Sequence, residues 1–297
     1  MNAQPTLGLP VGGRGRIAPP RLRAQISRVR RNTIGLAGAA IIAATAVVAA
    51  FGPLTWRADY ADQGSRRLLA PSAAHPLGTD ELGRDELSRI IHGTQVSLQV
   101  GMISVIIALV VGTTAGITAG FYGRTVDAVL MRGVDIMFAF PGLVLAIVIA
   151  GLLGPSRTNA MIAIGVVYAP AFARVVRGST LSVLSLPYVE AAKSLGISDL
   201  RIVFRHLLPN ILAPLIVLTT VYLSTAILTE AALSFLGLGT QPPEPSWGGM
   251  LNASRSYMER APWLAVAPGL AIMVVVLGFN FLGDGLRDVL DPQLRDA

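Results

Sequence analysis

The sequence predicts an all-α integral membrane protein with six transmembrane helices. Of its 297 residues, 53% are hydrophobic and 14% are charged, and the mean hydropathy is +0.61, well above that of a soluble domain. About 20 apolar residues suffice to cross the hydrocarbon core of a bilayer as a helix. Six apolar runs fit this description, at residues 34–54, 98–121, 126–153, 161–176, 212–236 and 263–282.

The distribution of basic residues predicts the orientation of these spans. The net charge is +7. If the N-terminus is inside, about twice as many Arg and Lys residues lie on the cytoplasmic side as on the outside, as the positive-inside rule requires. We therefore expect a multi-pass protein in the lipid bilayer of a bacterial cytoplasmic (inner) membrane, with both termini cytoplasmic, and no nucleic-acid partner.

The first 96 residues are expected to form three regions. Residues 1–33 are rich in Pro, Gly and Arg and predict a cytoplasmic basic tail that binds anionic lipid. Residues 34–54 predict a first anchor helix, which is long for the core of a cleaved export signal. Residues 55–96 predict an external segment.

Charged residues cluster near the end of this external segment. A helix that starts after Thr79 would align Glu81 with Asp85, and Asp85 with Arg89, one turn apart. Asp80 and Asp85 flank a glycine, which faintly resembles a calcium loop, but the twelve-residue ligand spacing of such loops is absent. Salt bridges at the membrane surface are the favoured interpretation, and no metal is expected.

The second and third spans are predicted to be antiparallel neighbours, because only residues 122–124 separate them. Gly112, Gly116 and Gly120 recur every four residues and form a stripe where another helix can approach closely. Pro141 is expected to kink the third span.

Charged residues and prolines also occur within the later spans. Asp127, Arg132 and Asp135 open the third span, where pairing within the bundle is favoured over contact with a substrate. Pro170 is expected to interrupt the fourth span, and Pro214 lies early in the fifth. Helix breaks are tolerated where they line a cavity, which favours a transport pathway.

The most informative stretch is the polar segment 185–210, which separates the fourth and fifth spans. Pro187 predicts the start of a helix, Gly196 its left-handed end, Ser198 the cap of a second helix, and Pro209 the end of that helix. Each helix is expected to present an apolar face to a partner. The two faces are Tyr188, Ala191, Ala192 and Leu195 on the first helix, and Leu200, Val203, Phe204 and Leu207 on the second.

This segment resembles the EAA loop of the membrane-spanning permeases of ABC importers, which reads EAA, three residues, Gly, nine residues, Ile, one residue, Leu-Pro. The matching residues are Glu190, Ala191, Ala192, Gly196, Leu208 and Pro209. His206 stands where the family has Ile. The resemblance implies that the segment, with Tyr188, is a coupling loop that fits a groove on a separate ATPase subunit.

A helix-turn-helix that binds DNA is the alternative from a different class, and it would make the chain a membrane-tethered regulator. Its second helix would span residues 198–207, and Arg201 and Arg205 would face phosphates. Apolar spans flank the segment on both sides, and apart from Lys193 the segment has few basic residues. The coupling loop is therefore favoured.

Three further runs resemble the C-type subunit of dipeptide and oligopeptide importers, at residues 75–101, 234–251 and 278–292. The resemblance implies the type I ABC importer transmembrane architecture, with a permease core at residues 97–285 and a cytoplasmic tail at 286–297. It also implies the partners: a second permease in a heterodimer, two ABC ATPase subunits and an extracytoplasmic solute-binding protein.

Two sites outside the coupling loop are candidates for contact with a substrate or a partner. Glu230 lies in the outer part of the fifth span, where a hydrogen bond to a neighbouring helix is favoured over a role in the pathway; Pro141 and Pro170 are the other candidates for pathway or packing roles. Pro242, Pro243 and Trp247 predict a stiff external loop, a candidate contact for the binding protein.

Catalytic motifs are missing from the sequence. There is no cysteine, no phosphate-binding loop and no nucleophile elbow. The chain is therefore expected to be a non-catalytic subunit without a cofactor, and the ATP is bound by partner subunits. The implied cargo is a dipeptide or oligopeptide, and nickel, glutathione and haem remain open within the same family.

Overall fold

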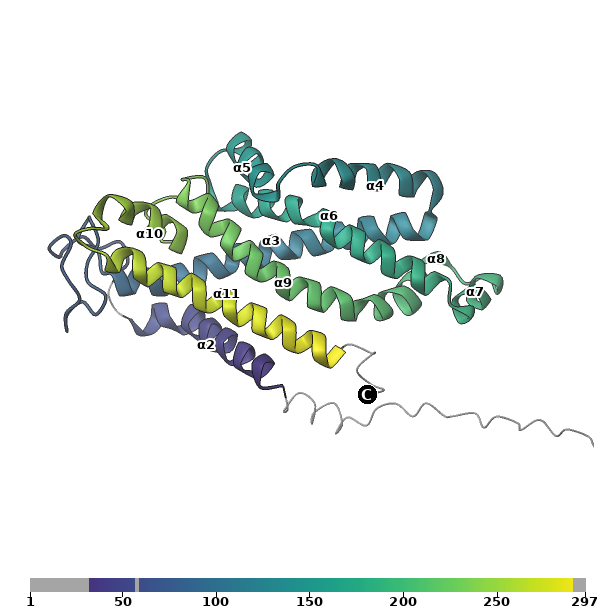
Figure 1. Cartoon of the computed structure of the whole chain (residues 1–297), viewed down its shortest axis with the longest axis horizontal. Helices are drawn as coiled ribbons and strands as arrows, with labels where there is room; N and C mark the ends of the chain where they lie inside the picture. Colours follow the sequence, from purple (N-terminus) through teal and green to yellow (C-terminus); the bar gives the residue numbers. More distant parts are fainter. Residues whose placement is uncertain (1–31, 57–58, 291–297) are drawn as a thin grey trace, which may run out of the picture.

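The computed structural model describes residues 32–56 and 59–290, and within these ranges the chain is helical without a β-strand. The predicted basic tail, apart from its last two residues, and the end of the C-terminal tail lie outside the described residues. Figure 1 shows long helices that run side by side along the molecule, with short helices at both ends. The long helices are α2 (Thr33–Thr55), α3 (Glu86–Tyr122), α6 (Arg157–Leu184), α9 (Leu208–Phe235) and α11 (Trp263–Leu290); the shorter ones are α4 (Arg124–Phe138), α5 (Gly142–Leu153), α7 (Pro187–Ser194), α8 (Asp199–Ile202) and α10 (Trp247–Ser254).

Five helical segments are long and apolar enough to cross a membrane, and α4 with α5 makes a sixth if this bent pair is one span. The predicted third span is thus not one straight helix: α4 and α5 are bent by 94° relative to each other. Pro141 stands immediately before α5. Proline has no N–H for a helical hydrogen bond and disfavours helical geometry in the residue before it, so the predicted kink becomes a break.

The glycine stripe on α3 packs against α6, as predicted. A Cβ on Gly112 would lie 2.4 Å from the carbonyl oxygen of Ala169, and one on Gly116 would lie 2.5 Å from that of Ala173. Both distances are too short for a side chain, so glycine allows the two backbones to touch. Pro170 lies in this contact, inside an unbroken α6, so the predicted interruption of the fourth span is wrong.

The first span, α2, packs antiparallel against the last, α11. A Cβ on Gly38 would lie 2.4 Å from the backbone nitrogen of Leu282. The side-chain amide of Asn32 donates to Asp288 over 3.0 Å. The beginning of α2 and the end of α11 therefore lie at the same end of the molecule, as an even number of crossings requires.

The helix that contains Pro209 does not end there, which contradicts the prediction. α8 continues through a π-helical turn at Val203–Leu207 directly into α9. In this turn the N–H of Leu208 donates to the carbonyl of Val203, five residues back, and Pro209 falls in the first turn of α9, where its missing N–H costs little. The coupling segment is therefore the short helix α7, a turn and the extended end of α9, rather than two separate helices.

The external segment also differs from the prediction. α3 begins at Glu86, not after Thr79, and Asp85 caps it by accepting a hydrogen bond of 2.8 Å from the backbone N–H of Ser88. The preceding residues form a tight turn in which the Asp80 side chain accepts from the backbone of Leu82 and Arg84. Gly83 has a φ of +82° in this turn, which stops a helix from starting earlier.

Candidate functional site

The coupling segment, residues 185–210, contains α7 and α8 and lies at one end of the bundle in Figure 1. α7 starts at Pro187, as predicted, and its end turns at Gly196, whose φ is +72°. The backbone N–H of Ile197 then returns to the carbonyl of Ala192 over 3.2 Å. Ser198 stands at the N-cap of α8, although its side chain makes no capping hydrogen bond.

The two arms of the segment are joined through their polar side chains. The amide of Asn210 donates to the hydroxyl of Tyr188 over 3.1 Å. The rings of Tyr188 and His206 are tilted against each other with centroids 5.7 Å apart. His206, the departure from the family pattern, therefore packs against a coupling-loop residue within this chain.

The predicted apolar faces are only partly buried. Val189, Ile202 and Leu207 face inward and pack beneath the segment with Val183, and Ala192 is also buried. Val189 and Ile202 were absent from the predicted faces. The large side chains left exposed are Leu195 at 81%, Leu200 at 72%, Phe204 at 65% and Tyr188 at 47%. This exposed apolar set, called the docking patch below, is what a soluble partner could cover.

The other residues of the predicted coupling loop lie around the docking patch. Glu190 and Ala191 are exposed on α7, Pro209 is exposed and Leu208 is half-buried. A Cβ on Gly196 would meet no atom within 4 Å, so the surface is open there. The segment thus presents a mixed apolar and polar surface to one side.

A cavity of about 440 Å³ lies between α6, α9 and α11. Its lining is mostly apolar, with Asn210 and Arg287 as polar members. A cavity of this size and composition is typical of sites for small molecules. The full lining is Val175, Asn210, Ala213, Pro214, Val217, Leu218, Val221, Arg287 and Leu290.

Two of the three charged residues predicted to pair within the bundle, Asp127 and Asp135 of α4, pair with α6, whereas Arg132 is exposed and forms no ion pair with a described residue. Arg177 donates to both carboxylate oxygens of Asp127 over 2.5 Å each. Arg174 donates to Asp135 over 2.9 Å, and its guanidinium lies 4.2 Å from the ring centroid of Phe138. The α4 helix is therefore fixed to α6 by two ion pairs, and the second of these is largely exposed.

Glu230 lies inside the bundle, away from the 440 Å³ cavity. Its side chain is 1% exposed and accepts a hydrogen bond of 2.8 Å from the hydroxyl of Ser234. Ser97 of α3 and Ser246 of the external loop lie near it, but its second carboxylate oxygen has no hydrogen-bond partner among the described residues. The one hydrogen bond of this carboxyl group is thus within α9, and both the packing role and the pathway role of Glu230 remain predictions.

The external loop contains both exposed and buried residues. Pro242 and Pro243 are exposed, as expected of a surface that meets a partner. Trp247 is 1% exposed and its indole N–H donates to the carbonyl of Ile90 over 3.3 Å, so the expectation that it contacts a binding protein directly is wrong. Arg157 forms an ion pair with Glu244 across 3.4 Å and links this loop to the start of α6.

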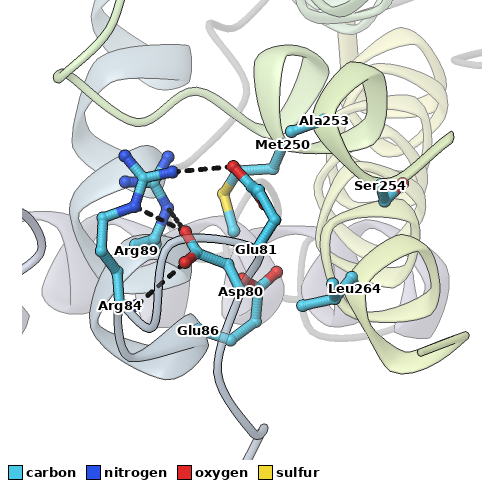
Figure 2. Close-up of a pocket in the computed structure, with 9 residues that line it drawn as sticks. All are labelled: Asp80, Glu81, Arg84, Glu86, Arg89, Met250, Ala253, Ser254 and Leu264. Atoms are coloured by element: carbon cyan, nitrogen blue, oxygen red, sulfur yellow. Dashed lines mark hydrogen bonds and ion pairs between the residues drawn. The ribbon is translucent and has the colours of Figure 1, made fainter. Parts of the chain in front are cut away.

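A buried charged cluster lies beneath α10 at the same end; the sequence analysis named Asp80, Glu81 and Arg89, but it missed Glu86 and the geometry of the cluster. Figure 2 shows interactions that converge on Asp80 from Arg84 and Arg89, at 2.6 and 3.4 Å. The space among these residues is about 10 Å³, room for one water molecule. The cluster is a structural ion-pair network, and it is too tight for a substrate.

Glu86 of this cluster is a buried acid at the very start of α3. With 37 residues, α3 is about 56 Å long, so its first turns extend beyond a hydrocarbon core of about 30 Å. Burial raises the pKa of Glu86 to about 8, against the opposing effect of the nearby Arg89. One oxygen of its carboxyl group is buried without a hydrogen-bond partner in the part of the chain that the structure describes, which fits a group held neutral.

Several transport permeases are similar to this chain in sequence over most of its length. The dipeptide transport permease DppC of Alkalihalophilus pseudofirmus is 48% identical over 92% of this chain and 90% of its own length. The glutathione transport permease GsiD of Pectobacterium atrosepticum is 49% identical over 76% of this chain and 75% of its own. The di/tripeptide permease DppC of Pseudomonas aeruginosa is 46% identical over 84% of each chain.

Solved structures of the MetNI methionine ABC transporter, in inward-facing conformations, show a similar fold. One of their chains has a TM-score of 0.54 and 21% identity, and the match covers 67% of this chain and 95% of that one. Residues 112–296 match the family model described as the binding-protein-dependent transport system inner membrane component. The family implies an ATPase and a substrate-binding protein as partners. The chain belongs to this family and is a non-catalytic, multi-pass permease subunit of an ABC importer.

Proposed function

We propose that this permease moves dipeptides or short oligopeptides into the cell. The observation that carries the proposal is the 48% identity to a dipeptide permease along 92% of the chain. The mostly apolar cavity of about 440 Å³ between α6, α9 and α11 supports it, because its volume suits a small peptide. Glutathione, itself a small peptide, is the second candidate, favoured by the relative that is 49% identical.

The docking patch is the proposed contact with the ATPase. When the ATPase subunits close on ATP, the patch moves with them. Because α8, the π-helical turn and α9 form one continuous helical run from Asp199 to Phe235, this motion passes directly into a helix that lines the cavity. A movement of the coupling loop would therefore also move α9, which lines the cavity.

The proposed complex contains a second, different permease, two ATPase subunits and an extracytoplasmic binding protein. The exposed Pro242 and Pro243 are the proposed contact with that binding protein. The permease itself binds no cofactor, and ATP is bound by the partner subunits. Nickel and haem are cargoes without support among the relatives named above.

A mild-detergent purification of the tagged chain tests the partners. Mass spectrometry of the eluate is expected to find a second permease and an ATPase with a phosphate-binding loop, and the eluate is expected to hydrolyse ATP. Recovery of the chain alone, with DNA retained, would favour the membrane-tethered regulator instead.

The cargo is tested in proteoliposomes that contain the assembled complex, with the binding protein and ATP supplied. Labelled dialanine is expected to accumulate, and unlabelled dipeptides are expected to compete with it. Competition by glutathione alone, without uptake of dialanine, would replace the dipeptide with glutathione as the cargo.

A further inference from the structure

The exposed face of α6 connects the Asp135–Arg174 ion pair with the cavity. Arg174 and Val175 are both exposed, and Val175 lines the cavity. At about 100° per residue, Gly178 lies between these two residues on the helix surface. A Cβ on Gly178 would meet no atom of the described residues within 4 Å. The surface from the ion pair to the cavity is therefore continuous and open.

The ion pair lies at membrane depth. Arg174 is 17 residues after Arg157, the first residue of α6, and 10 residues before Leu184, the last. At about 1.5 Å per residue, it lies about 15 Å from the cytoplasmic end of a helix about 42 Å long, inside a hydrocarbon core of about 30 Å. Charged side chains at this depth avoid lipid and face water or protein.

The side chains of this pair are 55% exposed for Arg174 and 61% exposed for Asp135. The neighbouring Asp127–Arg177 pair is only 20% and 33% exposed, and it is bidentate. The Asp135–Arg174 pair is joined by a single hydrogen bond, so most of the donors of its guanidinium and one carboxylate oxygen remain available to a ligand. Both pairs join α4 to α6, but they differ: the Asp127–Arg177 pair is bidentate and mostly covered, whereas the Asp135–Arg174 pair exposes charged atoms that a ligand can contact.

We propose that Asp135 and Arg174 bind the two charged ends of the transported peptide. This inference rests on the proposed function. Arg174 would bind the terminal carboxylate, whose two oxygens match the guanidinium group, and Asp135 would bind the terminal ammonium group. Phe138 holds the guanidinium in place from one side. The side chains of the peptide would enter the apolar cavity beside Val175, which explains how one site accepts many sequences.

The absence of cysteine from the chain gives a direct test. Gly178→Cys is placed in the assembled complex, with partner subunits made free of reactive cysteine, and its modification by a water-soluble cationic thiol reagent is timed. Dialanine at about ten times its apparent Kd is expected to slow the reaction about tenfold, because protection follows the fraction of free sites. N-acetyl-dialanine amide, which lacks both charges, is expected to give no protection.

Two variants and a matched control identify the groups. Asp135→Asn and Arg174→Gln are each expected to abolish protection by dialanine, whereas Asp127→Asn is expected to retain it. Equal protection by the capped peptide, or protection that survives both variants, would overturn the proposal. Failure of the reagent to reach Gly178→Cys would also overturn it, and would assign this face to contact with the second permease or lipid.

The uptake assay on the same proteoliposomes separates this inference from the proposed function. If dialanine uptake is normal but dialanine and the capped peptide protect Gly178→Cys equally, only the proposed binding site is overturned. The absence of dipeptide uptake would overturn the peptide cargo and the site with it.

Discussion

At Gly196, glycine is favoured by the backbone conformation alone, and not by a lack of space for a side chain. Its φ is +72°, and no atom lies within 4 Å of an added Cβ, so a substitution meets strain but no clash. A β-branched residue in this conformation costs on the order of 1–2 kcal/mol, whereas Asn adopts it more readily. We expect Gly196→Val to lower uptake about tenfold at normal membrane abundance and Gly196→Asn to retain most of it.

Uptake in cells and abundance in membrane fractions measure this prediction together. The substituted turn would displace the docking patch from its ATPase without disturbing the spans, so the Val variant is expected to co-purify poorly with the ATPase. Normal uptake by Gly196→Val at normal abundance would contradict the coupling assignment.

Glu86 predicts a pH dependence of stability. Its pKa is raised from 4.5 to about 8 by burial, so between these values the native protein holds a proton that the unfolded chain has released. Stability therefore falls as the pH rises from about 4.5 to about 8, by on the order of a few kcal/mol. We expect the melting temperature in detergent to drop between pH 5 and pH 9.

Glu86→Gln supplies the comparison, because the amide stays neutral at every pH. The variant is expected to show a flatter melting profile across this range, while Asp80, Glu81, Arg84 and Arg89 remain around the site. An unchanged pH profile in the variant would assign the dependence to other groups.

At the level of single residues, the backbone conformation could be predicted from the sequence more accurately than the burial of side chains. The left-handed turn at Gly196 follows from a local rule for glycine after a helix. The burial of Trp247 depends on Ile90, 157 residues earlier in the chain, and no local pattern contains that contact. The charged residues around Asp80 were found, but their pairing was not, because Gly83 delays the start of α3.

At the level of elements, three prolines with the same local chemistry have three different outcomes. Pro141 separates α4 from α5, Pro170 lies within the unbroken α6, and Pro209 lies in the first turn of α9, after a π-helical turn. Hydropathy predicted the apolar runs, because it reflects transfer from water to lipid. Whether a proline breaks a helix depends on the packing around it, such as the tight contact of α3 with α6 near Pro170.

The contact between α2 and α11 depends on a glycine at its centre. A Cβ on Gly38 would lie 2.4 Å from the nitrogen of Leu282 and 2.7 Å from the carbonyl oxygen of Gly278, both backbone atoms that cannot rotate away. We expect Gly38→Leu to separate α2 from α11 and lower stability by about 1–3 kcal/mol, seen as a lower melting temperature.

Gly269→Leu is the matched control for this contact. Gly269 lies on the same α11, and a Cβ there meets nothing within 4 Å. The control is expected to melt like the parent protein, and equal losses in both variants would contradict the role of close α2–α11 packing.

At the scale of the whole molecule, the two ends of the bundle differ in the side chains that they carry. One end has the docking patch, where large apolar side chains are exposed, and the other has the buried Asp80–Arg84–Arg89 network beneath α10. The continuous run from Asp199 to Phe235 connects the first end with the interior. The sequence placed the coupling loop between two spans, and the structure adds that one arm of the loop is the end of a span.

This arrangement predicts which end of the bundle faces the cytoplasm. The docking patch can meet an ATPase only if its end is inside the cell, and the start of α2 and end of α11 then lie inside as well. Because the chain has no cysteine, single substitutions report the sides directly. Ala73→Cys, exposed in the external segment, is expected to react with a membrane-impermeant maleimide on intact cells whose outer barrier, where present, is permeabilised. Asp284→Cys, exposed near the end of α11, is expected to react only after the cytoplasmic membrane is opened. The reverse pattern would place the docking patch outside the cell and exclude it as the contact through which ATP hydrolysis drives transport.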